Sequence, residues 1–427
     1  MENKDSVYHK FWGYLDKAND TYDTFVLNYH NKNYSDGVET YFHKKIATIV
    51  HLHYSELIPF CFEYISMIPP AIDIYITTSS ISTLEIIDFH ANRLNRANCH
   101  IIRKDNRGRD ISSLLVTCRD IIAEYQYLCF IHDKKSATAE FDEDIEIWLN
   151  NMWDNMLKST SYINNVIELL NNTQMGLLVP PKPYGKKVNY AFKNNWGINL
   201  ENTNKLANEL DISIIRENQN CDVLGTVFWC KTDALKKLFK KKWNYNDFPE
   251  EPLPGDGTIS HSVERILPFV AQDAGFHVGY IMNSDYAAMQ HIIMQKLLTI
   301  SFDITRNTYG IDDIDKLLFF KKNMDECINY CKKHSEIYIY GAGKIGTYCR
   351  LFLEMNLIAI KGFIVSDKKD SRTEYRRVYQ IDEVKKTKGM GIVIALNKKN
   401  REEVVHILKK YKLNDVFIYE FRARGIG

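Results

Sequence analysis

IATIVHLHY, residues 46–54, opens a series of four short apolar segments that continues with DIYITT (73–78), HIIR (100–103) and YLCFIH (127–132). Helical patterns that begin near Glu56, Ser82 and Ile111 separate these segments. Apolar segments that alternate with helices are typical of parallel strands joined by right-handed crossovers. The sequence therefore predicts an α/β fold with a mainly parallel, Rossmann-like sheet.

A chain of 427 residues is too long for one compact domain. Changes in composition along it predict four parts. Residues 1–42 are polar, rich in Tyr and Asn and weakly helical, and residues 43–305 carry the alternating strands and helices. Residues 306–333 form a helical linker, and residues 334–427 form a second, small Rossmann-like α/β domain.

Composition and charge exclude several classes of protein. No stretch approaches the roughly 18 consecutive apolar residues of a membrane-spanning helix. The charged start MENKDSVYHKFWGYLDK lacks the apolar core of a secretory signal, and the nine cysteines are odd in number and scattered, so we expect a cytoplasmic protein with reduced thiols. With 55 Lys and Arg against 54 Asp and Glu, no overall field attracts nucleic acid as a partner.

Polar side chains follow the predicted strands, at the sheet edge where open α/β sheets bind ligands. They are His51, His53, Tyr54, Thr77, Asn106, Arg107, Arg109, Asp110, His132, Asp133, Lys134 and Lys135. NRGRD (106–110) places two arginines around a glycine at a strand-to-helix turn, which suits a phosphate. A solvated turn in which Asp110 caps the helix fits the same residues. The pattern indicates an anion-binding edge, with a diphosphate as one candidate ligand.

A third group of polar residues lies in EEPLPGDGTISHSVER (250–265). Gly255 and Gly257 flank Asp256 at the start of a predicted helix that contains His261. A carboxylate on such a loop is a candidate general base, and Glu251 is close enough in sequence to be a rival.

The predicted carboxy-terminal domain begins with a strand and GAGKIG, the glycine pattern of a nucleotide-binding turn (Gly341, Gly343, Gly346). Asp367 follows the next strand about where an acid that binds ribose is expected. Because only about 90 residues remain, we expect a nucleotide-binding or purely structural role. An NAD-dependent reaction of this domain is a further alternative.

The chain resembles the rhamnan synthesis protein F family of bacterial glycosyltransferases over roughly residues 44–282. The resemblance rests on an ordered set of segments: HLHYSELIPF, DIYITT, NRGRDISSLL, HDKKS, GTVFW and DGTISHSVER. It implies a variant of the A-type glycosyltransferase fold, in which a Rossmann-like half binds a nucleotide sugar beside an acceptor half. The implied activity is that of a hexosyltransferase, which moves a sugar to a hydroxyl of a growing cell-surface polysaccharide (O-antigen, capsule or rhamnan type) with inversion. Only the family name suggests rhamnose as that sugar.

The resemblance also implies roles for particular residues. His51, His53, Tyr54 and Thr77 would contact the nucleoside, whereas Arg107, Arg109 and Asp110 would order the sugar and diphosphate. Asp256 resembles the base of inverting A-type enzymes. Phe228 and Trp229 in GTVFW would form a wall against which the acceptor sugar stacks, but the two rings could equally well be core aromatics of a strand.

The sequence departs from the metal-dependent A-type pattern at HDKK (132–135), where such transferases usually carry an Asp-x-Asp site. One carboxylate and two ammonium groups stand there, and cationic side chains can neutralise a leaving diphosphate without a metal. We therefore expect weak or absent dependence on a divalent metal, and the sequence assigns no other cofactor. The basic helix at 234–243 would make peripheral contact with the inner face of the plasma membrane, near a lipid-linked acceptor, unless its lysines are simply solvated. A catalytically inactive nucleotide-sugar-binding assembly protein is the alternative function.

Overall fold

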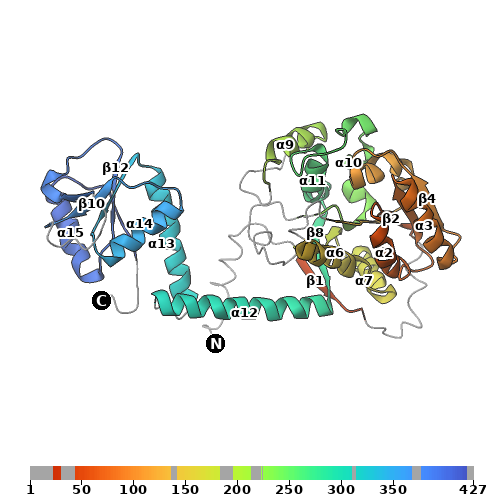
Figure 1. Ribbon diagram of the computed structural model, residues 1–427, viewed down its shortest axis with the longest axis horizontal. Helices are drawn as coiled ribbons and strands as arrows, with labels where there is room; N and C mark the ends of the chain where they lie inside the picture. The colour runs from red at the N-terminus through yellow and green to blue at the C-terminus, as the bar shows by residue number, and fades with distance from the viewer. Residues whose placement is uncertain are drawn as a thin grey trace. The chain divides into compact units, whose positions relative to one another are not determined.

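The structure, a computed structural model, describes residues 23–29, 44–135, 142–182, 196–212, 223, 225–309, 314–367 and 377–420. The chain divides into two compact units, Met1–Gln290 and His291–Gly427 (Figure 1). Within the described ranges, no helix combines the length and the apolarity that crossing a membrane requires. The eight cysteines in these ranges are free thiols.

The first unit is built on an eight-stranded sheet with the order β1-β8-β6-β7-β5-β2-β3-β4. Its strands are β1 (Asp23–Leu27), β2 (Ile46–His51), β3 (Asp73–Thr78), β4 (Cys99–Arg103), β5 (Tyr127–His132), β6 (Met175–Val179), β7 (Phe228–Lys231) and β8 (His277–Asn283). β7 runs antiparallel to β5 and β6, whereas all other neighbours are parallel. The prediction of a mainly parallel α/β sheet is confirmed.

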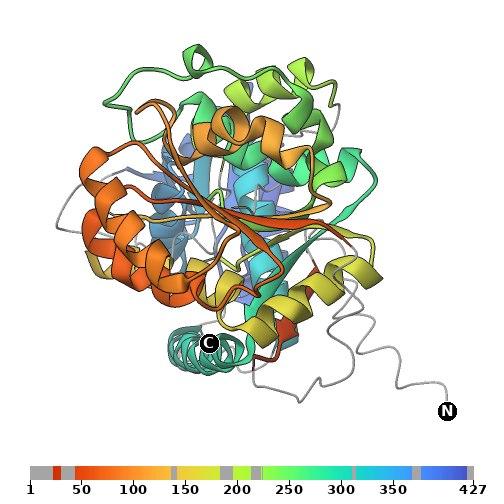
Figure 2. The ribbon, with the colours of Figure 1, turned by 90° about the vertical axis from the view of Figure 1, so that its right-hand side faces the viewer.

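Helices cover both faces of this sheet (Figure 2), because alternate residues of the buried strands point into two separate apolar cores. One face carries α2 (Ile58–Ile65), α3 (Ile81–Leu94), α6 (Asp142–Leu157) and α7 (Thr160–Asn172). The other carries α4 (Arg109–Ser112), the π-helical turn η3 (Ser113–Thr117), α5 (Arg119–Ile122), α9 (Leu200–Glu209), α10 (Lys236–Lys240) and α11 (Ile259–Asp273). Short 3-10 turns lie at Ser55–Leu57, Thr232–Leu235 and Tyr245–Asp247.

The expectation that residues 1–42 form a helical extension is wrong for Asp23–Leu27, which form the edge strand β1 parallel to β8. In this strand Phe25 and Leu27 pack against the core, while Val26 between them is 55% exposed. This period-two pattern favours a half-buried strand over a helix. The remaining residues of that predicted extension lie outside the described ranges.

The second unit has a five-stranded, fully parallel sheet with the order β11-β10-β9-β12-β13. The strands are β9 (Glu336–Tyr340), β10 (Gly362–Val365), β11 (Val378–Gln380), β12 (Met390–Ile394) and β13 (Val416–Ile418), with α14 (Lys344–Met355), α15 (Lys398–Lys410) and the 3-10 turn Ile381–Glu383 between them. Two long helices, α12 (Ser284–Tyr309) and α13 (Ile314–Lys332), precede this sheet. The prediction of a small carboxy-terminal α/β fold is confirmed.

Candidate functional site

The ends of β2 and β3 form a buried polar floor. His51 is 4% exposed, and its Nδ1 lies 3.1 Å from Thr77 Oγ1 and 2.9 Å from Ser113 Oγ. Burial, helped by the nearby ammonium of Lys104, lowers the pKa of His51 to about 3, so the imidazole is neutral. Thr77 is fully buried. His51 and Thr77 therefore form buried contacts beneath the strand-end turns, and they do not present exposed groups to a ligand.

Asp133, at the end of β5, holds the turn that follows β2. Its Oδ2 accepts hydrogen bonds of 2.7 Å from the backbone N–H groups of both His53 and Tyr54. Burial raises the pKa of Asp133 to about 6, although these two N–H donors oppose the shift. The structure thus brings together His53, Tyr54 and Asp133, as the sequence predicted for residues at adjacent strand ends.

A chain of polar contacts extends from this turn to the end of β4. The Nδ1 of His53 lies 3.4 Å from Ser79 Oγ, and the Ser79 hydroxyl donates to Asn106 Oδ1 over 3.2 Å. Asn106 is therefore a neighbour of the β2 turn.

Lys104 is buried and Asp110 is largely buried, and hydrogen bonds satisfy each of these ionisable groups only in part. Among the described residues, Asp110 Oδ2 has no hydrogen-bond partner, and it lies 3.8 Å from the Nε2 of His132. His132 in turn donates from Nδ1 to the backbone carbonyl of Asp133 over 2.6 Å. Burial raises the pKa of Asp110, but His132, His51 and the Thr226 hydroxyl outweigh it, so the net shift is downward.

Lys104 was missed by the sequence analysis. It directly follows β4, is 5% exposed, and makes one long contact of 3.4 Å from Nζ to the carbonyl of Arg107. Burial lowers its pKa to about 8, against the pull of Asp110, Asp105 and Glu251. The sequence does show a lysine directly after the strand-like segment HIIR, and residues at that position face the ligand-binding edge of a parallel sheet. This placement could have identified Lys104 as a candidate.

The two arginines of NRGRD have different roles. Arg107 donates from Nε to the carbonyl of Phe248 over 2.6 Å and from a terminal nitrogen to Asn246 Oδ1 over 3.2 Å. The expectation that Arg107 orders a diphosphate is not supported, since its guanidinium clamps the 246–248 loop. Gly108 allows this close approach: it has a φ of +74°, and a Cβ there would lie 2.7 Å from the Phe248 ring. Arg109 has a half-exposed side chain, 3.4 Å from Glu251 Oε1.

Asp256 is held at the start of α11 by neighbouring amides. Its Oδ1 accepts from Asn199 Nδ2 over 2.6 Å and from the N–H of Gly257 over 3.0 Å, while 41% of the side chain stays exposed. His261 Nδ1 lies 4.0 Å from that oxygen and accepts from the N–H of Thr258 over 3.3 Å. The carboxylate is therefore oriented but accessible, as a base requires.

Two ion-pair contacts join the three polar groups of the sequence into one site: His132 Nε2 lies 3.8 Å from Asp110 Oδ2, and Arg109 Nε lies 3.4 Å from Glu251 Oε1 in the loop before α11. Burial lowers the pKa of Lys134, and the carboxylates of Glu264 and Asp110 oppose this shift. Burial also lowers the pKa of His261, opposed by Glu264 and Asp256. The positive charges of Arg109 and Arg265 also lower the pKa of both Lys134 and His261. The site thus joins the ends of β2–β5 to the start of α11.

Glu264 and Arg265 are further residues whose role the sequence did not reveal. Their two side chains form an ion pair and are 16% and 11% exposed, so they do not lie on a solvated helix face. Lys134 is held over the ring of Trp148, 3.6 Å from its centroid. Lys135 is exposed and forms an ion pair with Glu56, at the outer rim of the site.

The prediction that Phe228 and Trp229 form an acceptor wall is wrong. Both are 0% exposed: Phe228 packs against Phe130 with ring centroids 5.9 Å apart, and Trp229 donates from Nε1 to the Met156 carbonyl over 3.0 Å. They occupy opposite faces of β7 inside the two cores. A ring buried in this way cannot stack on a sugar.

The basic helix predicted at 234–243 is shorter, and several of its lysines are paired. Lys236, Lys237 and Lys241 lie 3.8, 2.8 and 2.9 Å from carboxylate oxygens of Asp233, Asp273 and Glu209. These pairs favour a solvated face over a membrane-binding one.

Across the described ranges, no group of three or more His, Cys, Asp or Glu side chains is placed to bind a metal ion. At the position of an Asp-x-Asp site, Asp133 uses one oxygen for two N–H donors and is followed by two lysines. These residues do not fit a divalent cation.

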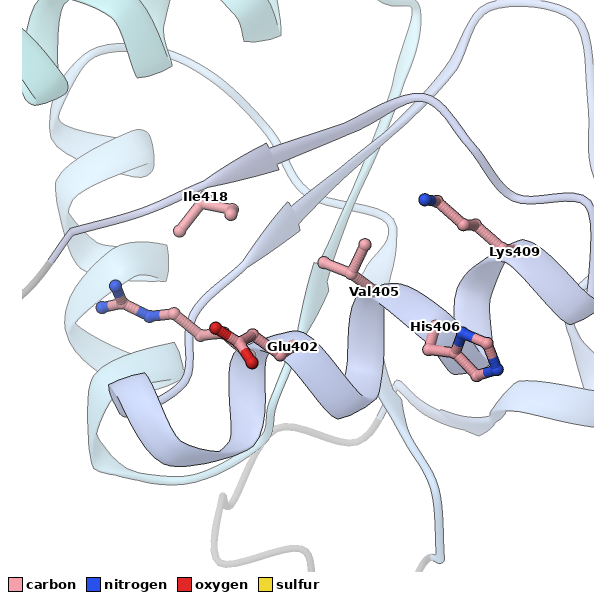
Figure 3. Close-up of a pocket in the computed structure, with 6 residues that line it drawn as sticks. Glu402, Val405, His406, Lys409 and Ile418 are labelled. Carbon is pink, nitrogen blue, oxygen red and sulfur yellow. The ribbon is translucent and has the colours of Figure 1, made fainter.

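In the second unit, the GAGKIG turn has the backbone geometry that its glycines imply. Gly341 has a φ of +110°, Gly343 caps α14, and a Cβ on Gly346 would lie 1.8 Å from the carbonyl oxygen of Gly341. Asp367 is exposed just after β10. A separate open hollow of about 360 Å³ lies beside α15 and is lined by Arg401, Glu402, Val405, His406, Lys409 and Ile418. Figure 3 shows the last five of these side chains with their labels. Nucleotide binding by Gly341, Gly343, Gly346 and Asp367 stays a prediction.

Two solved structures of glycosyltransferases are similar to the chain. The mannosyltransferase PcManGT from Pyrobaculum calidifontis, in complex with GDP-Man and Mn²⁺, is 12% identical, with a TM-score of 0.33 over 65% of this chain and 66% of that one. The glucosyl-3-phosphoglycerate synthase from Mycobacterium tuberculosis, in complex with Mn²⁺, UDP and glucosyl-3-phosphoglycerate, is 11% identical, with a TM-score of 0.27 over 65% and 87%.

Among curated proteins, the uncharacterised protein WxcX from two strains of Xanthomonas campestris pv. campestris is 22% identical over 239 residues. The match covers 54% of this chain, which spans about a third (32%) of the length of WxcX. The family model for rhamnan synthesis protein F matches residues 5–276, and these include every part of the site described above. The chain belongs to the rhamnan synthesis protein F family.

Proposed function

We propose that the chain is a glycosyltransferase that moves a sugar from a nucleotide sugar to a hydroxyl of a growing cell-surface polysaccharide. One observation carries this proposal: the ends of four strands and the start of α11 form a single site that holds both buried cations and an accessible carboxylate. Glycosyl transfer to a hydroxyl needs these two chemistries together, namely charge neutralisation for a leaving diphosphate and a base for the acceptor.

The donor side of the proposed reaction uses the cations around Asp110. Lys104 and Lys134 lie close enough to Asp110 for its negative charge to raise their pKa values. Arg109 lies close enough to Lys134 and His261 to lower theirs. When the bond between the sugar and the diphosphate breaks, negative charge develops on the leaving oxygen, and cations fixed in a buried site stabilise it more than cations in water would. Lys104 joins the predicted donor-binding residues, and Arg107 holds the adjacent loop.

The acceptor side uses Asp256 as the general base. Asn199 and the Gly257 N–H fix one carboxylate oxygen, so the carboxylate is already oriented when the acceptor hydroxyl arrives. His261 stands 4.0 Å away as a neighbouring group that can hold a proton. Glu251 is the weaker candidate, because it pairs with Arg109 and accepts from the Leu253 N–H over 3.0 Å.

Several finer points of the proposal rest on the family rather than on contacts. Rhamnose as the transferred sugar rests on the family name, and inversion at its reacting carbon rests on the family resemblance and the placement of Asp256. A lipid-linked acceptor and action at the cytoplasmic face of the membrane are expectations from the basic helix at 234–243, and its paired lysines do not support them. Independence from divalent metal follows from the charge pattern of HDKK and from the contacts of Asp133.

The first experiment is a thermal-shift panel of nucleotide sugars, nucleoside diphosphates and NAD(H), each with and without Mn²⁺, since a ligand of the native state raises its apparent stability. One nucleotide-sugar series should give a shift that does not depend on Mn²⁺. Lys104→Met should reduce this shift, whereas Lys236→Met, an exposed lysine that pairs with Asp233, should not. No shift with any nucleotide sugar would contradict the proposal.

A turnover assay with the donor found in this way separates the two functions that the sequence left open. Release of nucleoside diphosphate in the presence of an isolated polysaccharide acceptor supports the transferase. Donor binding without turnover on any acceptor favours an inactive assembly protein.

A further inference from the structure

Asn199 is the residue directly before helix α9, where an asparagine side chain commonly accepts a hydrogen bond from the first turn of its own helix. The Asn199 side chain makes no such capping bond. Because the residue is fully buried, its amide must find other partners within the protein. Helix α9 lies beside α11 (Figure 1), and these partners include the loop at the start of α11.

Both N–H groups and the oxygen of the Asn199 amide are used. Nδ2 donates to Asp256 Oδ1 over 2.6 Å and to the carbonyl of Trp196 over 3.1 Å. Oδ1 accepts from the N–H of Gly257 over 3.1 Å. Exchanging the amide nitrogen and oxygen would set two acceptor oxygens against each other at Asp256, so only one orientation satisfies all three contacts.

The turn 196–199 is also fixed to α11 by packing. The Trp196 ring is 3% exposed and stacks on Phe269 of α11, with ring centroids 5.7 Å apart. Gly197 has a φ of +54°, and a Cβ there would lie 2.9 Å from Asp256 Oδ2. Glycine therefore allows the turn to lie directly against the carboxylate.

The two oxygens of Asp256 have different surroundings. Among the described residues, both hydrogen bonds that this side chain accepts end on Oδ1, one from Asn199 Nδ2 and one from the Gly257 N–H. His261 Nδ1 lies 4.0 Å from the same oxygen. Oδ2 therefore keeps its lone pairs for a further donor, and the side chain is exposed enough for one to arrive.

We propose that the turn 196–199 selects the reacting oxygen of the transferase: it holds Oδ1 of Asp256 and leaves Oδ2 to take the proton of the acceptor hydroxyl. This assignment rests on the proposed function. In the reaction, the acceptor O–H bond breaks and its proton moves to Oδ2, while the acceptor oxygen bonds to the reacting carbon of the sugar. The bond from that carbon to the diphosphate breaks, and its electron pair leaves with the diphosphate. Asn199 and Gly197 act through Asp256, so both are positioning residues.

A matched pair of substitutions on α9 and its cap tests this assignment. Asn202 Nδ2 donates to the carbonyl of Gly257 over 3.0 Å, so it contacts the same loop but not the carboxylate. The assay uses the nucleotide sugar that gives the thermal shift and an isolated polysaccharide as acceptor. Asn199→Leu should lower kcat about 10- to 100-fold and leave the KM for the donor within about twofold. Asn202→Leu should leave both values within about twofold.

Gly197→Ala tests the side of the carboxylate that carries Oδ2, and it keeps the test decisive if Asn199→Leu does not fold. Its Cβ would displace Oδ2, so kcat should fall while the thermal shift with the donor stays. Thermal unfolding checks that each variant folds as the unaltered chain does.

Two results would overturn the assignment while the proposed function stands, provided that Asp256→Asn is inactive. One is a kcat within about threefold of the unaltered value for Asn199→Leu or Gly197→Ala. The other is an equal loss in Asn199→Leu and Asn202→Leu, which would assign the effect to loop packing. If the unaltered chain gives no turnover with any acceptor, the proposed function itself fails, and this assignment fails with it.

Discussion

Replacing Asp133 by Asn should make the protein more tolerant of high pH, although Asp133 is the carboxylate at the centre of the strand-end site. The Asn side-chain oxygen can still accept from the N–H groups of His53 and Tyr54, which Asp133 Oδ2 now does over 2.7 Å. The change therefore keeps the turn after β2 and removes the buried charge.

The magnitude follows from the raised pKa of Asp133, which is about 6 against an ordinary value of 3.8. The folded protein keeps the proton in a pH range where the unfolded chain has already lost it. The stabilisation from Asp133 is therefore complete below about pH 4 and is lost as the pH rises through 6. A shift of about two units corresponds to about 3 kcal/mol in the free energy of unfolding. Roughly 1.4 kcal/mol of this loss falls between about pH 5 and pH 8.

Urea unfolding at several pH values measures this difference. Between about pH 5 and pH 8, the free energy of unfolding of the unaltered protein should fall by about 1.4 kcal/mol relative to that of Asp133→Asn. Asp233→Asn serves as the control, because the Asp233 side chain is 78% exposed. Asp133→Ala should instead lose stability at every pH, since it leaves two N–H donors without their acceptor. Parallel pH profiles for the unaltered protein and Asp133→Asn would refute the reasoning.

Three further outcomes are expected. Asp256→Asn should lower turnover at least about 100-fold while leaving the thermal shift with the donor intact, because the amide cannot take the proton of the acceptor hydroxyl; near-normal turnover would remove Asp256 from this role. Treatment with EDTA should leave turnover unchanged, and a loss that Mn²⁺ restores would make Asp133 a metal ligand. Gly346→Ala should destabilise the second unit, because its Cβ would lie 1.8 Å from the Gly341 carbonyl oxygen; hydrogen exchange confined to β9 and α14 would report this change, and unaltered protection there would contradict it.

The central strands β2 and β5 could be predicted from the sequence because they are buried along their whole length, so their runs are almost continuously apolar. The edge strand β1 was harder to recognise, since only alternate residues of DTFVL pack on the core. The same limit applies to β11 and β13, which have three residues each and lie at the edges of the second sheet. Short edge strands carry too few residues for periodicity to separate them from loops.

The sequence was enough to predict that the site lies at the ends of the strands. It was not enough to predict the role of each side chain there. Arg107 and Arg109 are equivalent in the sequence, and only the packing of Phe248 on Gly108 decides that Arg107 serves the loop. Phe228 and Trp229 suit a ligand wall or a core equally well by composition. Their position on a central antiparallel strand settles the matter, because both faces of that strand are covered.

The charges at the end of β5 bear directly on how a leaving diphosphate is stabilised. A divalent cation needs several oxygen ligands, usually from more than one carboxylate. Asp133 is a single carboxylate, and it shares one oxygen between two N–H groups. Lys104, in contrast, is a buried cation whose pKa burial lowers to about 8, and the pKa of the partly exposed Lys134 is also lowered. An incoming diphosphate would raise the pKa of Lys104 again and keep its ammonium charged, so donor binding should take up a proton near pH 8.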